Sequence, residues 1–342
     1  MNDNKNDEAG ALPLLHKYFL IRKSYRMKKI IFSLVYVVCF LGLSAQQEHQ
    51  YTQWMNAKLA INPAYAGSNF SPCLTGIYRN QWVGFDKAPQ TQQLSYDMSL
   101  NNDRVGVGAN LYRNAVGITE YITFDAIYSY RIPVGNGFLG IGAQASIRNF
   151  SNDFSDPAIR STLPIAGDGS IPQGQVSKFV PDFGFGLYYN TSDFFIGASV
   201  PRLLNNEIDL EDIDDVIGEE VQHAYFMAGY KIGLSENLEL LPQGLVKYAD
   251  NSPLDVDFNV SLIIQDKWTV GGTYRFGGDE ENFGESLDLL LGAQFTNHIY
   301  AGLSWDFTLS EINTATDGSL EIVLRYCFES SEGEEFANPR FF

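Results

Sequence analysis

Charged residues are scarce in this sequence, and basic residues are the scarcest of them. Charged residues make up 19% of the 342 positions, and 23 Lys and Arg stand against 41 Asp and Glu, for a formal charge of −18. Because nucleic-acid binding needs a basic face, this balance excludes nucleic acid as a partner. Only 3 Cys are present, which excludes a disulfide-dense scaffold.

Long hydrophobic runs are also nearly absent. The one candidate covers residues 30–43, begins just after Met27 and two lysines, and is followed by small residues ending at Ala45. It is shorter than the roughly 20 residues that a membrane-spanning helix needs. A basic start, a short apolar run and small residues are typical of a Sec-type secretory signal peptide, which we assign to residues 27–45. We expect residues 1–26 to be a non-native upstream extension and Met27 to be the true start.

Aromatic residues, by contrast, are abundant. They make up 14% of the chain, with 24 Phe and 19 Tyr, while the mean hydropathy is slightly negative. A disordered chain carries few aromatics, and a bundle of transmembrane helices is far more apolar. A transmembrane β-barrel fits both values, because half of each strand faces a polar lumen. Residues 319–328 alternate in this way, with Ile322 and Leu324 on one face and Arg325 on the other.

Alternation of apolar and polar residues, which predicts β-strands with two different faces, recurs in fourteen segments. Most have about the 9–11 residues that a tilted membrane strand needs, and an even number suits a bacterial single-chain barrel. The segments are 72–81, 90–100, 104–113, 119–131, 137–149, 178–190, 193–200, 221–232, 237–248, 254–265, 267–277, 285–296, 298–308 and 319–328.

The connections between these segments support the same fold. Joins after even-numbered segments are short and rich in turn-forming residues, whereas the long joins, notably 150–177 and 201–220, follow odd-numbered segments. Outer-membrane barrels have short periplasmic turns and longer extracellular loops. We therefore predict an all-β fold, a transmembrane antiparallel β-barrel of about 14 strands over residues 72–328, embedded in the lipid bilayer of the outer membrane. The strands of an exported soluble β-sandwich also alternate between apolar and polar residues. Such a sandwich needs polar outer faces, however, and nothing in its fold would place the long loops after odd-numbered strands only.

No catalytic motif is recognisable in this sequence. None of the three histidines after the signal peptide, His49, His223 and His298, has metal-ligand spacing to another histidine or to a cysteine. We therefore expect no enzymatic activity, no cofactor and no metal site. Residues 206–220 are rich in Asp and Glu; a solvated extracellular loop is the favoured interpretation, and a calcium site without the EF-hand pattern is the alternative.

Two cysteines lie in the first and last predicted strands, which are neighbours if the barrel closes. Cys73 and Cys327 both share the phase of the polar residues and lie near the periplasmic ends. The exported setting permits oxidation, so a disulfide across the seam is one interpretation. The other interpretation is that the two cysteines are small residues without a bridge. A bridge needs Cα atoms within roughly 7 Å, and the sequence pattern does not fix the register of the two strands.

Two further segments flank the predicted strands. Residues 46–71 are polar and aromatic without alternation. We expect them to form an N-terminal periplasmic segment that lies along the rim and partly plugs the lumen, which would keep a rather large barrel from leaking. We expect residues 329–342 to form a periplasmic C-terminal tail, whose end docks on the barrel base or on a partner.

Short motifs around the first strand resemble those of one known family. Residues 62–68 read NPAYAGS, and residues 78–85 read YRNQWVGF. With the terminal NPRFF of residues 338–342, they resemble the PorP/SprF family of Bacteroidetes outer-membrane proteins of the type IX secretion and gliding machinery. The resemblance covers residues 46–342; the upstream extension and the acidic loop depart from it. It makes the following residues candidates for partner contacts: Asn62, Pro63, Tyr65, Gly67, Arg79, Gln81, Trp82, Gly84, Pro339, Arg340, Phe341 and Phe342.

The resemblance implies a non-enzymatic role in the type IX protein secretion system. Family members are expected to act in the secretion or surface attachment of large adhesin-like substrates with a C-terminal sorting domain. The implied partners are other components of this system in the periplasm and the outer membrane, and the secreted surface adhesin. An outer-membrane channel for small or hydrophobic solutes is the alternative. An aromatic, hydrophobic lumen would favour the channel, and a plugged lumen with acidic outer loops would favour docking.

Overall fold

The computed structural model describes residues 48–157, 159, 174–209, 216–250, 252–277 and 284–329. The predicted upstream extension, the signal peptide and the end of the tail with residues 339–342 lie outside this part of the chain. Within the described part, no helix combines the length and the apolar character needed to cross a membrane.

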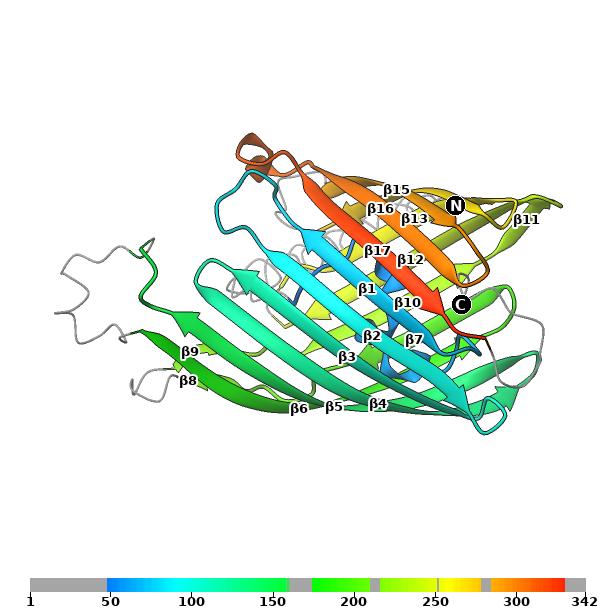
Figure 1. Cartoon of the computed structure of the whole chain (residues 1–342), viewed down its shortest axis with the longest axis horizontal. Helices are drawn as coiled ribbons and strands as arrows, with labels where there is room; N and C mark the ends of the chain where they lie inside the picture. Colours follow the sequence, from blue (N-terminus) through cyan, green and yellow to red (C-terminus); the bar gives the residue numbers. More distant parts are fainter. Residues whose placement is uncertain are drawn as a thin grey trace, which may run out of the picture. The chain divides into compact units, whose positions relative to one another are not determined.

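Fourteen antiparallel strands form one closed ring, which confirms the predicted barrel (Figure 1). Strands adjacent in the chain pair with each other, and the ring closes where the first strand meets the last. All fourteen predicted segments are present, with ends shifted by a few residues. They are β1 (Cys73–Asn80), β2 (Gln90–Leu100), β3 (Val105–Val116), β4 (Thr119–Val134), β5 (Gly137–Asp153), β6 (Gln175–Asn190), β7 (Phe194–Val200), β10 (His223–Tyr230), β12 (Leu238–Ala249), β13 (Asp255–Ile264), β14 (Trp268–Phe276), β15 (Ser286–Gln294), β16 (Ile299–Thr308) and β17 (Ser319–Cys327).

Short elements supplement the ring. β11 (Ile232–Ser235) continues β10 along β12, since Gly229 faces Gln243 and, three residues later, Ile232 faces Leu240 in the same register. A hairpin of two further strands lies in the connection from β7 to β10. The remaining elements are β8 (Glu207–Asp209), β9 (Val216–Glu219), η1 (Trp54–Asn56), α2 (Lys58–Ile61), η2 (Pro63–Tyr65) and η4 (Glu311–Thr314).

The two faces of the strands have opposite environments. In β17, Glu321 and Arg325 are buried, whereas Ile322 and Leu324 are 44% and 57% exposed. This is the reverse of a soluble protein, in which water contacts the polar face. An outward apolar band is what a barrel presents to lipid tails, so the exposed faces are the membrane-facing surface.

The two ends of the barrel differ as the connections predicted. Every connection longer than four residues lies at one end, which we take as extracellular. Asn101, Asn102 and Asp103, in the turn after β2, have positive φ angles, as tight turns built from Asn and Asp allow. The short turns at the periplasmic end are 101–104, 135–136, 191–193, 236–237, 265–267 and 295–298.

The extracellular edge of the wall is uneven. β4, β5 and β6 have 16, 17 and 16 residues, but β7 has 7 and pairs only with residues 185–190 of β6. Beyond β7 the Pro201 carbonyl accepts a hydrogen bond from Gln144 Nε2 at 2.8 Å, and the Leu203 N–H then donates to the Phe183 carbonyl of β6 at 2.9 Å. The chain therefore stays beside β6 up to the start of the β8–β9 hairpin.

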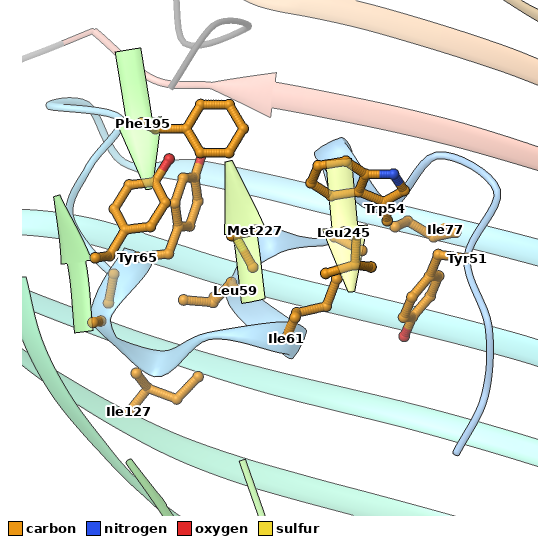
Figure 2. Close-up of a cluster of buried hydrophobic side chains, with 14 of the residues drawn as sticks. Tyr51, Trp54, Leu59, Ile61, Tyr65, Ile77, Ile127, Phe195, Met227 and Leu245 are labelled. Carbon is orange, nitrogen blue, oxygen red and sulfur yellow. The ribbon is translucent and has the colours of Figure 1, made fainter. Parts of the chain in front are cut away.

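The hydrophobic core lies inside the barrel. Residues of the segment 51–66 pack there against inward-facing side chains of the strands (Figure 2). Trp54, Phe195 and Met227 have no exposed surface. We call residues 48–71 the luminal plug, because this stretch, with η1, α2 and η2, fills the interior that the strands enclose.

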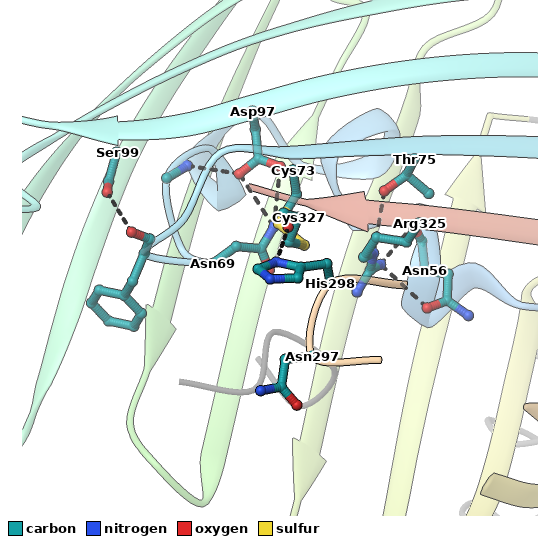
Figure 3. The surroundings of a disulfide bond; sticks show 12 residues. Asn56, Asn69, Cys73, Thr75, Asp97, Ser99, Asn297, His298, Arg325 and Cys327 are labelled. Carbon is teal, nitrogen blue, oxygen red and sulfur yellow. Dashed lines mark hydrogen bonds between the residues drawn. A yellow bond between two sulfur atoms is a disulfide. The ribbon is translucent and has the colours of Figure 1, made fainter. Parts of the chain in front are cut away.

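The seam between β1 and β17 carries a covalent link at its periplasmic end. Cys73 lies directly opposite Cys327 in the register, with Cα atoms 4.1 Å apart, and a disulfide joins the two side chains (Figure 3). Both cysteines are buried on the luminal side. Because 254 positions separate them, the bridge encloses the whole chain of the barrel in one covalent loop.

Peptide mapping without reduction should recover the Cys73 and Cys327 peptides as one linked species. Replacing both by Cys73→Ser and Cys327→Ser should lower the free energy of unfolding by about 2–4 kcal/mol, because the unfolded chain regains the freedom that the bridge removes. Urea unfolding in detergent micelles measures this loss, and reduction of the unmodified protein should reproduce it. Two free thiols in the native protein would contradict the bridge.

Candidate functional site

The luminal plug crosses the lumen from the extracellular end to the periplasmic end. At the extracellular end, the Glu48 carboxylate accepts hydrogen bonds from Arg148 and Arg202, each at 2.9 Å. Arg202 follows the outer end of β7. At the periplasmic end, the Phe70 carbonyl accepts a hydrogen bond from Ser99 near the last residue of β2. The first described residue of the plug thus lies on the extracellular side of the lumen.

The motif around Asn62 holds the plug to the wall at mid-height. The Asn62 side-chain amide donates to the Leu187 carbonyl of β6 at 2.9 Å, and its oxygen accepts the backbone N–H of Ala64 at 2.9 Å. Pro63 begins η2, where its fixed φ suits the first helical position. Asn62 therefore both caps η2 and pairs with a strand.

Glycines in the wall allow this close approach. A Cβ added at Gly142 would lie closer than 3.0 Å to the Ala64 backbone, and one at Gly186 would clash with Asn62. Gly106 and Gly140 face the Ala66 and Ala64 carbonyls in the same way. We call Gly106, Gly140, Gly142 and Gly186 the glycine cradle. Glycine normally weakens a strand, and the close approach of the plug explains why these strands contain it.

Tyr65 and Gly67 fix the lower part of the plug. The Tyr65 hydroxyl donates to Asn69 Oδ1 at 2.8 Å, and its ring meets Tyr188 edge-on with centroids 5.4 Å apart. Gly67 has φ +78°, a conformation that L side chains rarely adopt. Its N–H donates to Asp97 and its carbonyl accepts from Arg131 at 2.7 Å.

Arg79 joins the plug to the seam. Its guanidinium contacts Asp306 at 2.8 Å and Glu321 at 3.5 Å, and it also donates to the Thr52 hydroxyl. The Glu321 carboxylate accepts the backbone N–H groups of Thr52 and Gln53 at 2.9 and 2.8 Å. We call Arg79, Asp306 and Glu321 the seam latch. A buried charge without a partner is strongly unfavourable. These contacts therefore stabilise the buried charges and also attach the plug to the wall.

A second charged cluster lies at the extracellular end of the plug. Arg148 contacts Glu220 at 2.6 Å as well as Glu48. Burial raises the pKa of the Glu48 carboxyl, but the charges of Arg148 and Arg202 and the hydrogen bond with His49 outweigh it and hold that pKa well below its usual range. Burial lowers the pKa of the His49 imidazole, which favours its neutral form.

The other candidate residues lie away from the plug. Gln81, Trp82 and Gly84 belong to the extracellular connection from β1 to β2, where the Trp82 N–H donates to Ser319 Oγ at 3.1 Å. Trp82 and Gly84 have positive φ angles of 52° and 92°. Four of the sequence candidates, Asn62, Pro63, Tyr65 and Gly67, thus lie in the plug, and Arg79 contacts it. Pro339, Arg340, Phe341 and Phe342 lie outside the described residues.

Sequence reasoning missed the wall residues that hold the plug. Alternation in the last strand predicts that Arg325 lies on the polar face, but it does not predict what the polar face contacts. No local pattern connects Glu321 with Thr52, which lies 269 positions away. In the part of the chain that the structure describes, no group of three or more His, Cys, Asp or Glu is arranged to hold a metal ion. The calcium alternative for residues 206–220 stays untested, because 210–215 are not described.

Lys58 is a buried amine held among aromatic rings. It is 3% exposed, and its Nζ lies 3.9 Å from the Phe195 ring centroid and 5.7 Å from that of Tyr65. Burial, and then the charge of Arg325, lower the pKa of Lys58 to about 7. Cation–π attraction favours the charged form and opposes this shift.

The stability of the barrel should rise between pH 7 and pH 10, with a slope from Lys58 approaching about 1.4 kcal/mol per pH unit. The unfolded chain retains the Lys58 proton in this range, whereas the folded chain has released it, so raising the pH favours the folded state. Lys58→Met should remove this rise, and Lys267→Met, at an exposed turn, should not. Urea unfolding at both pH values measures the difference. An unchanged pH dependence in Lys58→Met would show that Lys58 stays charged.

Gly142→Val should displace the plug and open the lumen, because its side chain needs the space that the Ala64 backbone occupies. Overpacking of this kind typically costs about 1–3 kcal/mol. Planar-bilayer recordings should show a closed wild-type barrel and a conducting variant. Gly233→Ala is the matched control, since a Cβ there meets nothing within 4 Å. A Gly142→Val barrel as closed and as stable as the wild type would contradict the role of the cradle.

The chain was compared with curated proteins, solved structures and protein families. No curated protein matches it. Among solved structures it is similar to a mutant of the monoaromatic hydrocarbon channel TodX, at 12% identity over 80% of this chain and 94% of that one, with a TM-score of 0.48. It is also similar to Acinetobacter baumannii Omp33, at 10% identity over 76% and 100% with a TM-score of 0.44, and to a Pseudomonas aeruginosa FadL homologue, at 12% over 76% and 89% with a TM-score of 0.42. Likeness of this degree says nothing about what this chain does.

The family comparison is specific. The family described as type IX secretion system membrane protein PorP/SprF matches residues 43–326, which include the plug and all fourteen strands of the ring except the last residue of β17. The family predicted from the motifs is thereby confirmed. This outer-membrane barrel belongs to the PorP/SprF family of type IX secretion system membrane proteins.

Proposed function

We propose that this barrel is a non-enzymatic component of the type IX secretion system that acts in the secretion, or the retention at the cell surface, of large adhesin-like proteins with a C-terminal sorting domain. It works with other components of that system in the periplasm and the outer membrane, in the gliding machinery of a Bacteroidetes cell. Membership of the PorP/SprF family supports a role in the type IX secretion system. The filled lumen supports binding, rather than conduction, as the way in which the barrel acts.

The luminal plug is the observation that carries this proposal. Trp54 and Asn62 have no exposed surface, and the core that surrounds them spans the interior of the barrel. A channel for solutes needs a continuous path through the lumen, and a large secreted protein needs a far wider one. The closed interior therefore favours a barrel that binds its substrate at a surface over one that conducts it.

Charge pairing in the lumen supports a binding role. Several of its buried charges pair with one another or with the plug backbone, as Glu321 does with two N–H groups. Such pairing stabilises a structure. The disulfide of Cys73 and Cys327 is consistent with export to an oxidising compartment, as the signal peptide assigned to residues 27–45 predicts.

Affinity purification of the tagged barrel from outer membranes should recover a secreted protein with a C-terminal sorting domain, together with periplasmic components of the system. Deleting the barrel should remove that secreted protein from the cell surface, because its binding site is lost. Mass spectrometry of the purified complex and of surface-shaved peptides measures both effects.

Complementation with the unaltered chain, and with Gly233→Ala as a neutral variant, should restore surface display. A deletion strain with an unchanged surface proteome would contradict the proposed function. So would a purified wild-type barrel that conducts small solutes in planar bilayers, since an open lumen favours the channel alternative.

A further inference from the structure

The seam disulfide joins the two ends of the barrel chain. Cys73 is the first residue of β1 and Cys327 is the last residue of β17, and 254 positions separate them. Both cysteines lie at the periplasmic ends of their strands. Until the ring closes, β1 and β17 are the two free edges of an open sheet. Both thiols then lie on chain that other proteins of the periplasm can reach.

Closure of the ring buries both cysteines. In the closed barrel Cys73 and Cys327 are each 1% exposed. On its other side Cys73 pairs with Asp97 of β2. The seam also continues past the bridge toward the periplasm, because the Phe328 N–H donates to the Pro72 carbonyl at 2.8 Å. The bridge therefore does not lie at an open edge of the sheet.

The plug and a periplasmic turn lie against the bridge, as Figure 3 shows for Asn69 and His298. Asn69 is 3% exposed, and its side-chain amide donates to Asp97, the residue opposite Cys73, at 3.1 Å. His298 belongs to the turn between β15 and β16, and its carbonyl accepts the Cys327 N–H at 2.9 Å. Its Nδ1 lies 2.8 Å from the Cys327 carbonyl. The bridge is thus packed between wall, plug and turn.

Formation of a disulfide by exchange needs direct contact between sulfur atoms. A thiolate attacks a sulfur of the oxidant and forms a mixed disulfide with it. An oxidant that is itself a protein must therefore bring its own sulfur up to Cys73 or Cys327. The burial of both cysteines prevents this approach in the closed barrel. A protein oxidant can act only while the ends of β1 and β17 are still accessible.

We propose that the unclosed chain is the substrate of a periplasmic dithiol oxidase, which joins Cys73 to Cys327 before the ring closes. Closure then shields the bridge from every protein thiol. The link also prepares closure, because the pairing of β1 with β17 no longer has to close a flexible loop over the whole chain. Since the two cysteines lie directly opposite each other, the link favours the register in which Arg79 faces Glu321.

The reaction needs only the two thiols and the disulfide of the oxidase. One thiolate of the chain attacks the oxidase disulfide, forms a mixed disulfide and releases an oxidase thiolate. The second thiolate attacks the sulfur of the first, which forms the bond between Cys73 and Cys327 and breaks the bond to the oxidase. The chain loses two protons and two electrons. The oxidase disulfide takes up both and leaves as a dithiol.

The order of the two events is measured in cells that produce the full chain. Newly made protein is sampled at intervals, its accessible thiols are blocked with N-ethylmaleimide, and electrophoresis without heating separates closed from unclosed barrels. Peptide mapping of each fraction without reduction shows whether Cys73 and Cys327 are linked. We expect the closed fraction to carry the link from the earliest time. Closed barrels that start with two free thiols would overturn the proposal.

Shielding of the sulfur atoms is measured on the purified barrel in micelles. In the Cys327→Ser chain, Cys73 should react with a polymer-linked maleimide at least about 100-fold more slowly in the closed barrel than in urea, since only local opening exposes it. Ser235→Cys, in a chain that also carries Cys73→Ser and Cys327→Ser, is the matched control. Ser235 is exposed at the same end of the barrel, so its replacement should react at similar rates in both states. Similar rates for Cys73 in both states would contradict the shielding.

The unmodified barrel gives a further measurement that does not depend on variants. Reduced thioredoxin, a protein dithiol, should leave the bridge of the closed barrel intact, whereas a phosphine reductant in urea should remove it. Loss of the bridge from the closed barrel would show that a protein thiol reaches Cys73 or Cys327, and the proposal would fail. These results concern assembly of the barrel alone, so the proposed function stands or falls separately.

Discussion

Closure of the sheet is the constraint on which the rest of this structure depends. Lipid offers no hydrogen bonds to the backbone, so each strand needs a neighbour on both sides and the first strand must meet the last. The register of that meeting places Cys73 opposite Cys327 and Arg79 opposite Glu321. One pairing therefore sets both the covalent link at the periplasmic end of the seam and the ion pair near its extracellular end.

A ring of fourteen strands encloses an interior that the luminal plug fills in this protein. Its inner face carries charges such as Arg79, Glu321 and Arg131, which are costly to bury without partners. The plug provides part of the pairing, through the N–H groups of Thr52 and Gln53 and the carbonyl of Gly67. The glycine cradle in turn lets the plug backbone come close enough to fill the space. Wall and plug thus stabilise each other, since each provides hydrogen-bond partners for the other.

The barrel was predictable from sequence because its signal is local and repeated. Alternation predicts which way each side chain points, as it does for Arg325, and the order of short and long joins predicts which end of the barrel is which. The path of the plug was not predictable, because residues 46–71 follow neither the strand nor the helix period. Its contacts also link distant positions, as when Asn62 meets Leu187, 125 residues away. The motif around Asn62 is recognisable by resemblance to a family. The sequence does not show, however, that this motif packs against the wall glycines.

A plug that belongs to the same chain differs from a separate one in how it can form and leave. It runs into β1 beside the bridge at Cys73, so it cannot dissociate. The closed ring has no free edge through which it could enter from the side. Until Thr52 and Gln53 reach Glu321, that carboxylate lacks two of its hydrogen-bond donors at the very strand where the ring must close. Closure around a lumen that already holds the plug is therefore favoured over closure of an empty ring, and the filled interior follows from the same event that completes the sheet.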